Sequence, residues 1–68
     1  MPFNELSHVS QALRRKAAND SAFSFINTRL VLRTGINLNA IQPTDNGNRA
    51  AILRVLAALK EMGFDLDS

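Results

Sequence analysis

The chain has 68 residues, of which 46% are apolar and 21% are charged, and its formal net charge is +2. This composition is typical of one folded domain and argues against a disordered chain. Because the sequence has no cysteine and one histidine, it excludes disulfides, cysteine-based metal sites and a histidine-rich metal cluster.

The location of the protein is predicted from two features of the sequence. Residues 1–6 do not have the basic segment and apolar run of a signal peptide. The longest apolar run, Val55–Leu59, is far too short for a bilayer span. We therefore expect a cytoplasmic protein without membrane contact.

The charges are unevenly distributed along the chain. Residues 61–68 carry three acids and no base, so residues 1–60 hold all eight bases against three acids, a net charge of +5. A basic body with an acidic tail suits binding to nucleic acid or to an acidic protein surface. Solvated surface charge is the alternative explanation.

Residues 4–18 are predicted to form the first helix. Its apolar side chains recur at steps of three and four, which places them on one face. They are Leu6, Val9, Leu13 and Ala17. Asn4 is the expected N-cap, and the basic run 14–16 lies near the C-terminus, where the helix dipole favours cations.

Residues 22–34 are predicted to form a second helix that is apolar on two sides. Phe23, Ile26 and Leu30 share one face, whereas Phe25 and Leu32 fall on the opposite face. A strand is the alternative, because Phe, Ile, Thr and Val all favour strands.

The way the segment ends favours the helix. Gly35 is placed to adopt a left-handed C-cap conformation, after which Ile36 can pack on Val31 in a Schellman motif. The same pattern recurs at Gly63, where Phe64 can pack on Leu59. Two such endings in one short chain indicate helices.

Residues 35–48 are predicted to form a long connection, because they are rich in Asn and also contain Pro and Gly. Ile36, Leu38 and Ile41 are expected to hold it to the core. A short helical turn over residues 38–41 would end before Pro43.

Residues 48–62 form the clearest predicted helix, with Asn48 as its N-cap. Its apolar stripe consists of Ile52, Val55, Leu56, Leu59 and Met62. Leu53 and several alanines widen the stripe, and residues 65–68 form an acidic tail that is expected to fray. The predicted fold is therefore all-α: one domain over residues 1–68, a small bundle of three principal helices.

Catalysis finds little support in the sequence. His8 is the only side chain that ordinarily titrates near pH 7, and no set of nucleophile, base and orienting acid surrounds it. The three glycines are far apart, so no phosphate-binding loop is present. We predict no catalytic, metal-binding or cofactor-binding residue, and no enzyme.

A helix-turn-helix centred on Gly35 is one way to bind DNA. Val31 and Ile41 occupy positions that are typical of helix-turn-helix motifs. Residues 30–41 therefore resemble that class of motif. However, Pro43 would lie inside the recognition helix, and residues 37–42 contain no Arg or Lys for phosphates or guanine edges.

The leading functional hypothesis is a small non-enzymatic regulatory or adaptor protein that binds another macromolecule as a homodimer. The predicted dimer or partner interface consists of Phe25, Leu32, Leu53 and Ala57. In the rival interpretation, Leu38 and Ile41 fold the connection over this patch. The alternative function is a helical DNA-binding transcriptional regulator. Its predicted contacts to nucleic acid, or to an acidic partner, are Arg14, Arg15, Lys16, Arg29 and Arg33.

Overall fold

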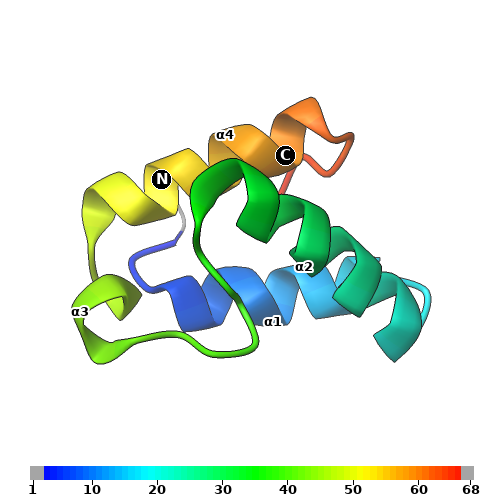
Figure 1. The fold of residues 1–68 in the computed structure, drawn as a ribbon, viewed down its shortest axis with the longest axis horizontal. Helices are drawn as coiled ribbons and strands as arrows, with labels where there is room; N and C mark the ends of the chain where they lie inside the picture. The colour runs from blue at the N-terminus through cyan, green and yellow to red at the C-terminus, as the bar shows by residue number, and fades with distance from the viewer. Residues whose placement is uncertain (1–2, 67–68) are drawn as a thin grey trace.

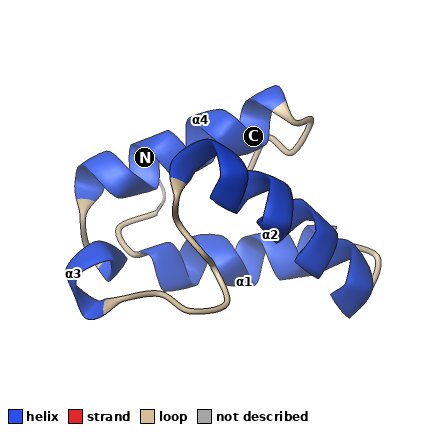
Figure 2. Cartoon of the chain, viewed as in Figure 1, coloured by secondary structure: helices blue, strands red, loops and turns tan. Residues whose placement is uncertain are grey.

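The computed structural model describes residues 3–66, which are all-α and contain no strand (Figure 2). The helices are α1 (Leu6–Lys16), α2 (Asp20–Thr34), α3 (Pro43–Asn46) and α4 (Arg49–Glu61). Helix α2 lies across α1 and α4 on the side nearest the viewer, and α3 packs beside the start of α1 (Figure 1). The predicted small bundle with three principal helices is confirmed.

The core lies between α1, α2 and α4 and contains the side chains that helical periodicity places on the inner faces. These buried residues are Leu6, Val9, Leu13, Phe23, Ile26, Leu30, Ile52, Val55, Leu56 and Leu59. Burial of each large aliphatic or aromatic side chain stabilises the fold by about 1.5–3 kcal/mol. The periodicity of the sequence therefore predicted the inner face of every principal helix.

Both predicted glycine caps are present, with different hydrogen bonds. Gly35 has φ +74°, and its N–H donates to the Val31 carbonyl at 2.8 Å. The Ile36 N–H donates to the Thr34 hydroxyl instead of continuing to Val31, so this end is an αL motif. At Gly63 the full Schellman pair forms, because the Phe64 N–H reaches the Leu59 carbonyl at 2.8 Å.

An asparagine side chain caps the start of α2 and the start of α4, whereas a tertiary contact caps the start of α1. Asn19 and Asn48 cap α2 and α4 through their side-chain oxygens. The predicted Asn4 cap of α1 is wrong: Glu5 is the N-cap residue, and its side chain caps no backbone N–H. Asn46 of α3 accepts from the Ser7 N–H at 3.0 Å, so a distant residue caps this helix.

The connection contains a helix that the sequence interpretation missed. Helix α3 begins at Pro43, where we expected helical structure to have ended. Proline is well suited to a first helical position, because its φ is fixed and its absent N–H would have no helical partner there. The expected turn near residue 38 is a single turn closed by the Ala40 N–H and the Asn37 carbonyl.

The connection is held to the bundle by apolar and polar contacts together. Ile36 and Leu38 are buried, as predicted, and Ile41 is half-buried. Asn27, which is 5% exposed, accepts from the Leu38 N–H at 2.9 Å and donates to the Asn37 side chain at 2.7 Å. The side chain of Asn27 therefore supplies hydrogen bonds that no helix or sheet provides to this loop.

The chain after α4 turns back onto the core. Phe64 and Leu66 are half-buried and pack against it. Of the predicted acidic tail over residues 65–68, the last two residues lie outside the described part of the chain.

Candidate interaction surface

The side of α2 that faces away from the bundle carries large apolar side chains in water. Phe25 is 66% exposed and Leu32 is 83% exposed. We call the residues Phe25, Thr28, Arg29 and Leu32 the outer face of α2. Thr28, Arg29 and Leu32 follow Phe25 by three, four and seven residues, which places all four on one side of the helix.

The connection does not cover this face. Leu38 is only 3% exposed and belongs to the core, while Leu32 remains the most exposed of the large apolar residues. The rival interpretation, in which Leu38 and Ile41 shield the patch, is therefore wrong for Leu32. The physical reason is that Asn27 ties Leu38 close to the inner side of α2.

The polar groups of the outer face are already arranged within the helix. The Thr28 hydroxyl donates to the Ser24 carbonyl at 2.9 Å, and the Arg29 guanidinium lies 5.9 Å from the centre of the Phe25 ring. A cation at this distance from an aromatic face is weakly attracted to it. A partner on this face would meet two apolar side chains with a positive charge beside them.

Leu53 and Ala57, the other two predicted interface residues, belong to α4. Leu53 is 50% exposed and Ala57 is exposed. Ala57 lines a cavity with residues of α2, whereas Leu53 does not line it. The four predicted residues are therefore all accessible, and they are divided between two helices.

That cavity lies between the end of α2 and the second half of α4 and has a volume of about 420 Å³. We call it the α2–α4 cavity, and it is lined by Arg33, Thr34, Arg54, Ala57, Ala58 and Glu61. The Thr34 hydroxyl donates to the Leu30 carbonyl and accepts from the Ile36 N–H. Within residues 3–66, the cavity side chains without a polar partner are therefore two guanidinium groups and one carboxylate.

The structure separates the predicted basic residues into different environments. The Arg14 guanidinium lies 3.8 Å from the centre of the Phe23 ring and donates to the Asn39 side chain. Arg15 and Lys16 are exposed at the end of α1. Arg33 lies at the α2–α4 cavity with Arg54.

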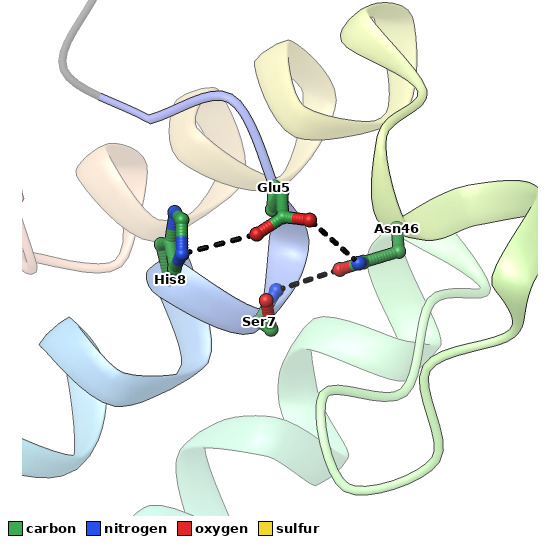
Figure 3. A network of polar contacts seen from close by, with 4 residues as sticks. All are labelled: Glu5, Ser7, His8 and Asn46. Atoms are coloured by element: carbon green, nitrogen blue, oxygen red, sulfur yellow. Dashed lines mark hydrogen bonds and ion pairs between the residues drawn. The ribbon is translucent and has the colours of Figure 1, made fainter.

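A second polar cluster joins the start of α1 to α3 (Figure 3). His8 Nε2 lies 3.0 Å from Glu5 Oε2, and Asn46 donates to the other Glu5 oxygen at 3.3 Å. Ser7 takes part through its backbone N–H, and within residues 3–66 no hydrogen bond joins its hydroxyl to His8. His8 and Glu5 are nearly half exposed. The arrangement fits a structural link between α3 and α1 better than a nucleophilic site.

The described part of the chain contains no group of three or more acidic, histidine or cysteine side chains placed to hold a metal ion. Within residues 3–66, no helix is both long enough and apolar enough to cross a membrane.

Comparison of the chain with protein-family models, with curated proteins and with solved structures finds no match. The function is therefore inferred from the exposed side chains, the cavity and the charges.

Proposed function

We propose that this chain is a small non-enzymatic regulatory or adaptor protein that acts by binding another macromolecule, as a homodimer formed through the outer face of α2. The observation that carries the proposal is the exposure of Leu32 (83%) and Phe25 (66%) on one side of a well-formed helix. Large apolar side chains that lie together in water usually mark an interface in a soluble protein.

The energetics of such an interface favour a reversible dimer. Burying one Leu and one Phe from each of two copies contributes roughly 6–12 kcal/mol in total. Association costs on the order of 4–15 kcal/mol in lost translational and rotational freedom and in side-chain ordering. The most favourable difference, about 8 kcal/mol, corresponds to a dissociation constant near micromolar, so these side chains by themselves support at most a weak, reversible dimer.

Self-association also suits the size of the chain. A core built by 68 residues seldom contributes more than about 3–5 kcal/mol of net stability. A partner that binds only the folded state adds stability in proportion to the logarithm of its concentration. A twofold dimer supplies that partner from the same chain.

Sedimentation velocity over a range from low to high micromolar concentration tests the dimer. We expect the wild type to shift from monomer to dimer across this range. We expect Leu32→Glu to stay monomeric and folded, because position 32 is in water in the monomer but an unpaired charge is strongly disfavoured in an apolar interface. Gln11→Glu is the matched control, since it adds the same charge at an exposed position of α1.

A wild type that sediments as a monomer at high micromolar concentration would contradict the dimer. A Leu32→Glu variant that remains a dimer would show that the interface lies elsewhere. Loss of helical circular dichroism in Leu32→Glu would contradict the exposure of this side chain.

One observation favours the alternative function, a small DNA-binding regulator. Arg29 and Arg33 are one helical turn apart, and Arg33 lines the cavity with Arg54, so two helices bring arginines to one region. The proposed contacts would be to phosphates, because the chain has no Tyr or Trp for stacking on bases.

The helix-turn-helix version of this alternative is wrong. Residues 37–42, which would form the recognition helix, contain a turn and no helix. The Asn27 side chain holds this segment against α2.

Ionic strength separates the two functions. Binding through phosphates weakens steeply with salt, whereas an apolar protein interface does not. If the alternative holds, Arg29→Ala together with Arg33→Ala should lower affinity for all DNA sequences alike and flatten the salt slope. Failure of the wild type to retard DNA or RNA in gels at low salt would remove this alternative.

A further inference from the structure

We propose that the α2–α4 cavity binds a carboxylate side chain of a protein partner, an aspartate or a glutamate held between Arg33 and Arg54. This proposal rests on the proposed function, because the occupant is part of a bound protein. It adds a second contact point and the chemistry of the partner, since the outer face of α2 by itself selects only for apolar surface.

The two arginines are available to a ligand. Among residues 3–66, neither Arg33 nor Arg54 has a carboxylate within ion-pair distance or a side-chain hydrogen bond. They come from two different helices and line the same cavity. A guanidinium group presents its N–H donors in a planar fork that matches the two oxygens of a carboxylate.

The floor of the cavity suits the aliphatic part of an acidic side chain. Ala57 and Ala58 place methyl groups between the charged residues, and Ala58 is only 8% exposed. A volume of about 420 Å³ exceeds the space that one carboxylate group needs and lies within the range of ligand sites. The cavity can therefore take a side chain together with adjoining backbone.

The charge of the cavity favours a carboxylate over a phosphate. Arg33 and Arg54 supply two positive charges and Glu61 one negative charge, so the lining has a net charge of +1. One carboxylate matches this charge, whereas a phosphate dianion brings a second negative charge toward Glu61. Like charges brought together in this way select against the wrong partner.

The cavity is continuous in sequence with the outer face of α2, because Arg33 directly follows Leu32. The proposed dimer face and the cavity nevertheless consist of different residues. A partner can therefore place its acidic side chain in the cavity while a second copy of the chain covers Phe25 and Leu32.

Heteronuclear NMR tests the site with a defined probe. The probe is an acetylated, amidated pentapeptide with a central glutamate between alanines, and the matched peptide has a central glutamine. We expect the glutamate peptide to shift the amide resonances of Ala57 and Ala58, and the glutamine peptide to leave them unchanged. Equal shifts with both peptides, or no shift at millimolar peptide, would overturn the proposal.

Substitutions locate the contact within the cavity. Arg33→Gln and Arg54→Gln should each weaken binding of the glutamate peptide about tenfold, the effect of losing one charge-assisted hydrogen bond. Arg49→Gln is the matched control, because it removes the same charge from an exposed position of α4 that does not line the cavity. A similar loss in Arg49→Gln would indicate general electrostatic attraction and overturn the site.

Inorganic phosphate provides the competing ligand. We expect phosphate to bind the wild type more weakly than the glutamate peptide, and Glu61→Gln to strengthen phosphate binding more than peptide binding. Phosphate binding as tight as peptide binding in the wild type would overturn the assignment to a carboxylate.

The oligomeric state, measured by sedimentation, distinguishes the carboxylate site from the proposed dimer. Arg33→Gln should sediment like the wild type, whether the wild type is a monomer or a dimer. If the wild type is a monomer but the peptide binds, only the dimer fails. If Arg33→Gln converts a wild-type dimer to monomer, the carboxylate comes from a second copy and the partner proposal is overturned.

Discussion

Helices α1 and α2 both carry apolar side chains at helical spacing, but they use them differently. The large apolar residues of α1 all lie on one side and are buried. In α2 one side is buried, while Phe25 and Leu32 on the other side remain in water. The apolar side of α1 is fully buried by folding, whereas α2, which is apolar on two sides, keeps one of them exposed.

The arginines of α1 and α2 differ in a similar way. Arg14 of α1 packs over Phe23 and bonds to Asn39, so it contributes to the fold. Arg33 of α2 lines the cavity without an ion-pair partner among residues 3–66. Folding therefore leaves Phe25, Leu32 and Arg33 of α2 exposed.

The largest effect on the free energy of unfolding is expected from a comparison of two leucines of α2. Leu30→Ala should lower the free energy of unfolding by about 2–5 kcal/mol, because Leu30 is fully buried in the core. Leu32→Ala should change it by less than about 0.5 kcal/mol at protein concentrations too low for association. Urea unfolding followed by circular dichroism measures both. A comparable loss in both variants would mean that the outer face belongs to the core.

The next effect concerns the polar contact between α2 and the connection. Asn27→Leu should lower the free energy of unfolding by about 1–3 kcal/mol, since it removes the buried acceptor of the Leu38 N–H and the donor to Asn37. Hydrogen exchange of the Leu38 amide should also accelerate more than that of core amides in α1. Unchanged exchange at Leu38 would show that Asn27 does not hold the connection.

A smaller effect is expected at the end of α2. Gly35→Val should lower the free energy of unfolding by about 1–2 kcal/mol, because a β-branched residue is strained at φ +74°. A Cβ atom at this position meets no neighbouring atom within 4 Å, so the expected loss comes from backbone strain. Gly47→Ala is the control, because φ is −99° there and the space is equally open. An unchanged melting temperature in Gly35→Val would exclude the left-handed cap.

The smallest effect on the free energy of unfolding is expected from a comparison of two adjacent arginines of α1. Arg14→Ala should lower the free energy of unfolding by about 0.5–1 kcal/mol, through loss of the contact with the Phe23 ring. Arg15→Ala should stay within about 0.5 kcal/mol of the wild type, because Arg15 is exposed and has no ion-pair partner among residues 3–66. Equal losses measured by urea unfolding would show that the ring contact contributes nothing.

Much of the fold could be predicted from local patterns. The inner faces of the three long helices follow from the spacing of Leu, Ile, Val and Phe. The ends of α2 and α4 follow from Gly35 and Gly63, because only glycine adopts their backbone conformation without strain. The accessible apolar residues Phe25 and Leu32 were also predicted, since they oppose an apolar face on the same helix.

The candidate site was predicted only in part. Arg33 and Ala57 were singled out separately, but nothing in the sequence placed them in one cavity with Arg54 and Glu61. Arg33 lies more than 20 positions before the three residues of α4. Their proximity depends on how α2 packs against α4, which the helical periodicity of each helix does not specify.

The sequence by itself determined the helices, their buried faces and the two glycine caps, because these depend on residues within about one or two helical turns of each other. The tertiary structure decided which polar side chains have a hydrogen-bond or charge partner. Asn46 caps α1 from a distance, Asn27 holds the connection, and Arg14 packs on Phe23. Arg33 and Arg54 have no ion-pair partner within residues 3–66. The physical reason is that hydrogen bonds and charge contacts need atoms within a few ångströms, and for residues far apart in the chain only the packed fold sets those distances.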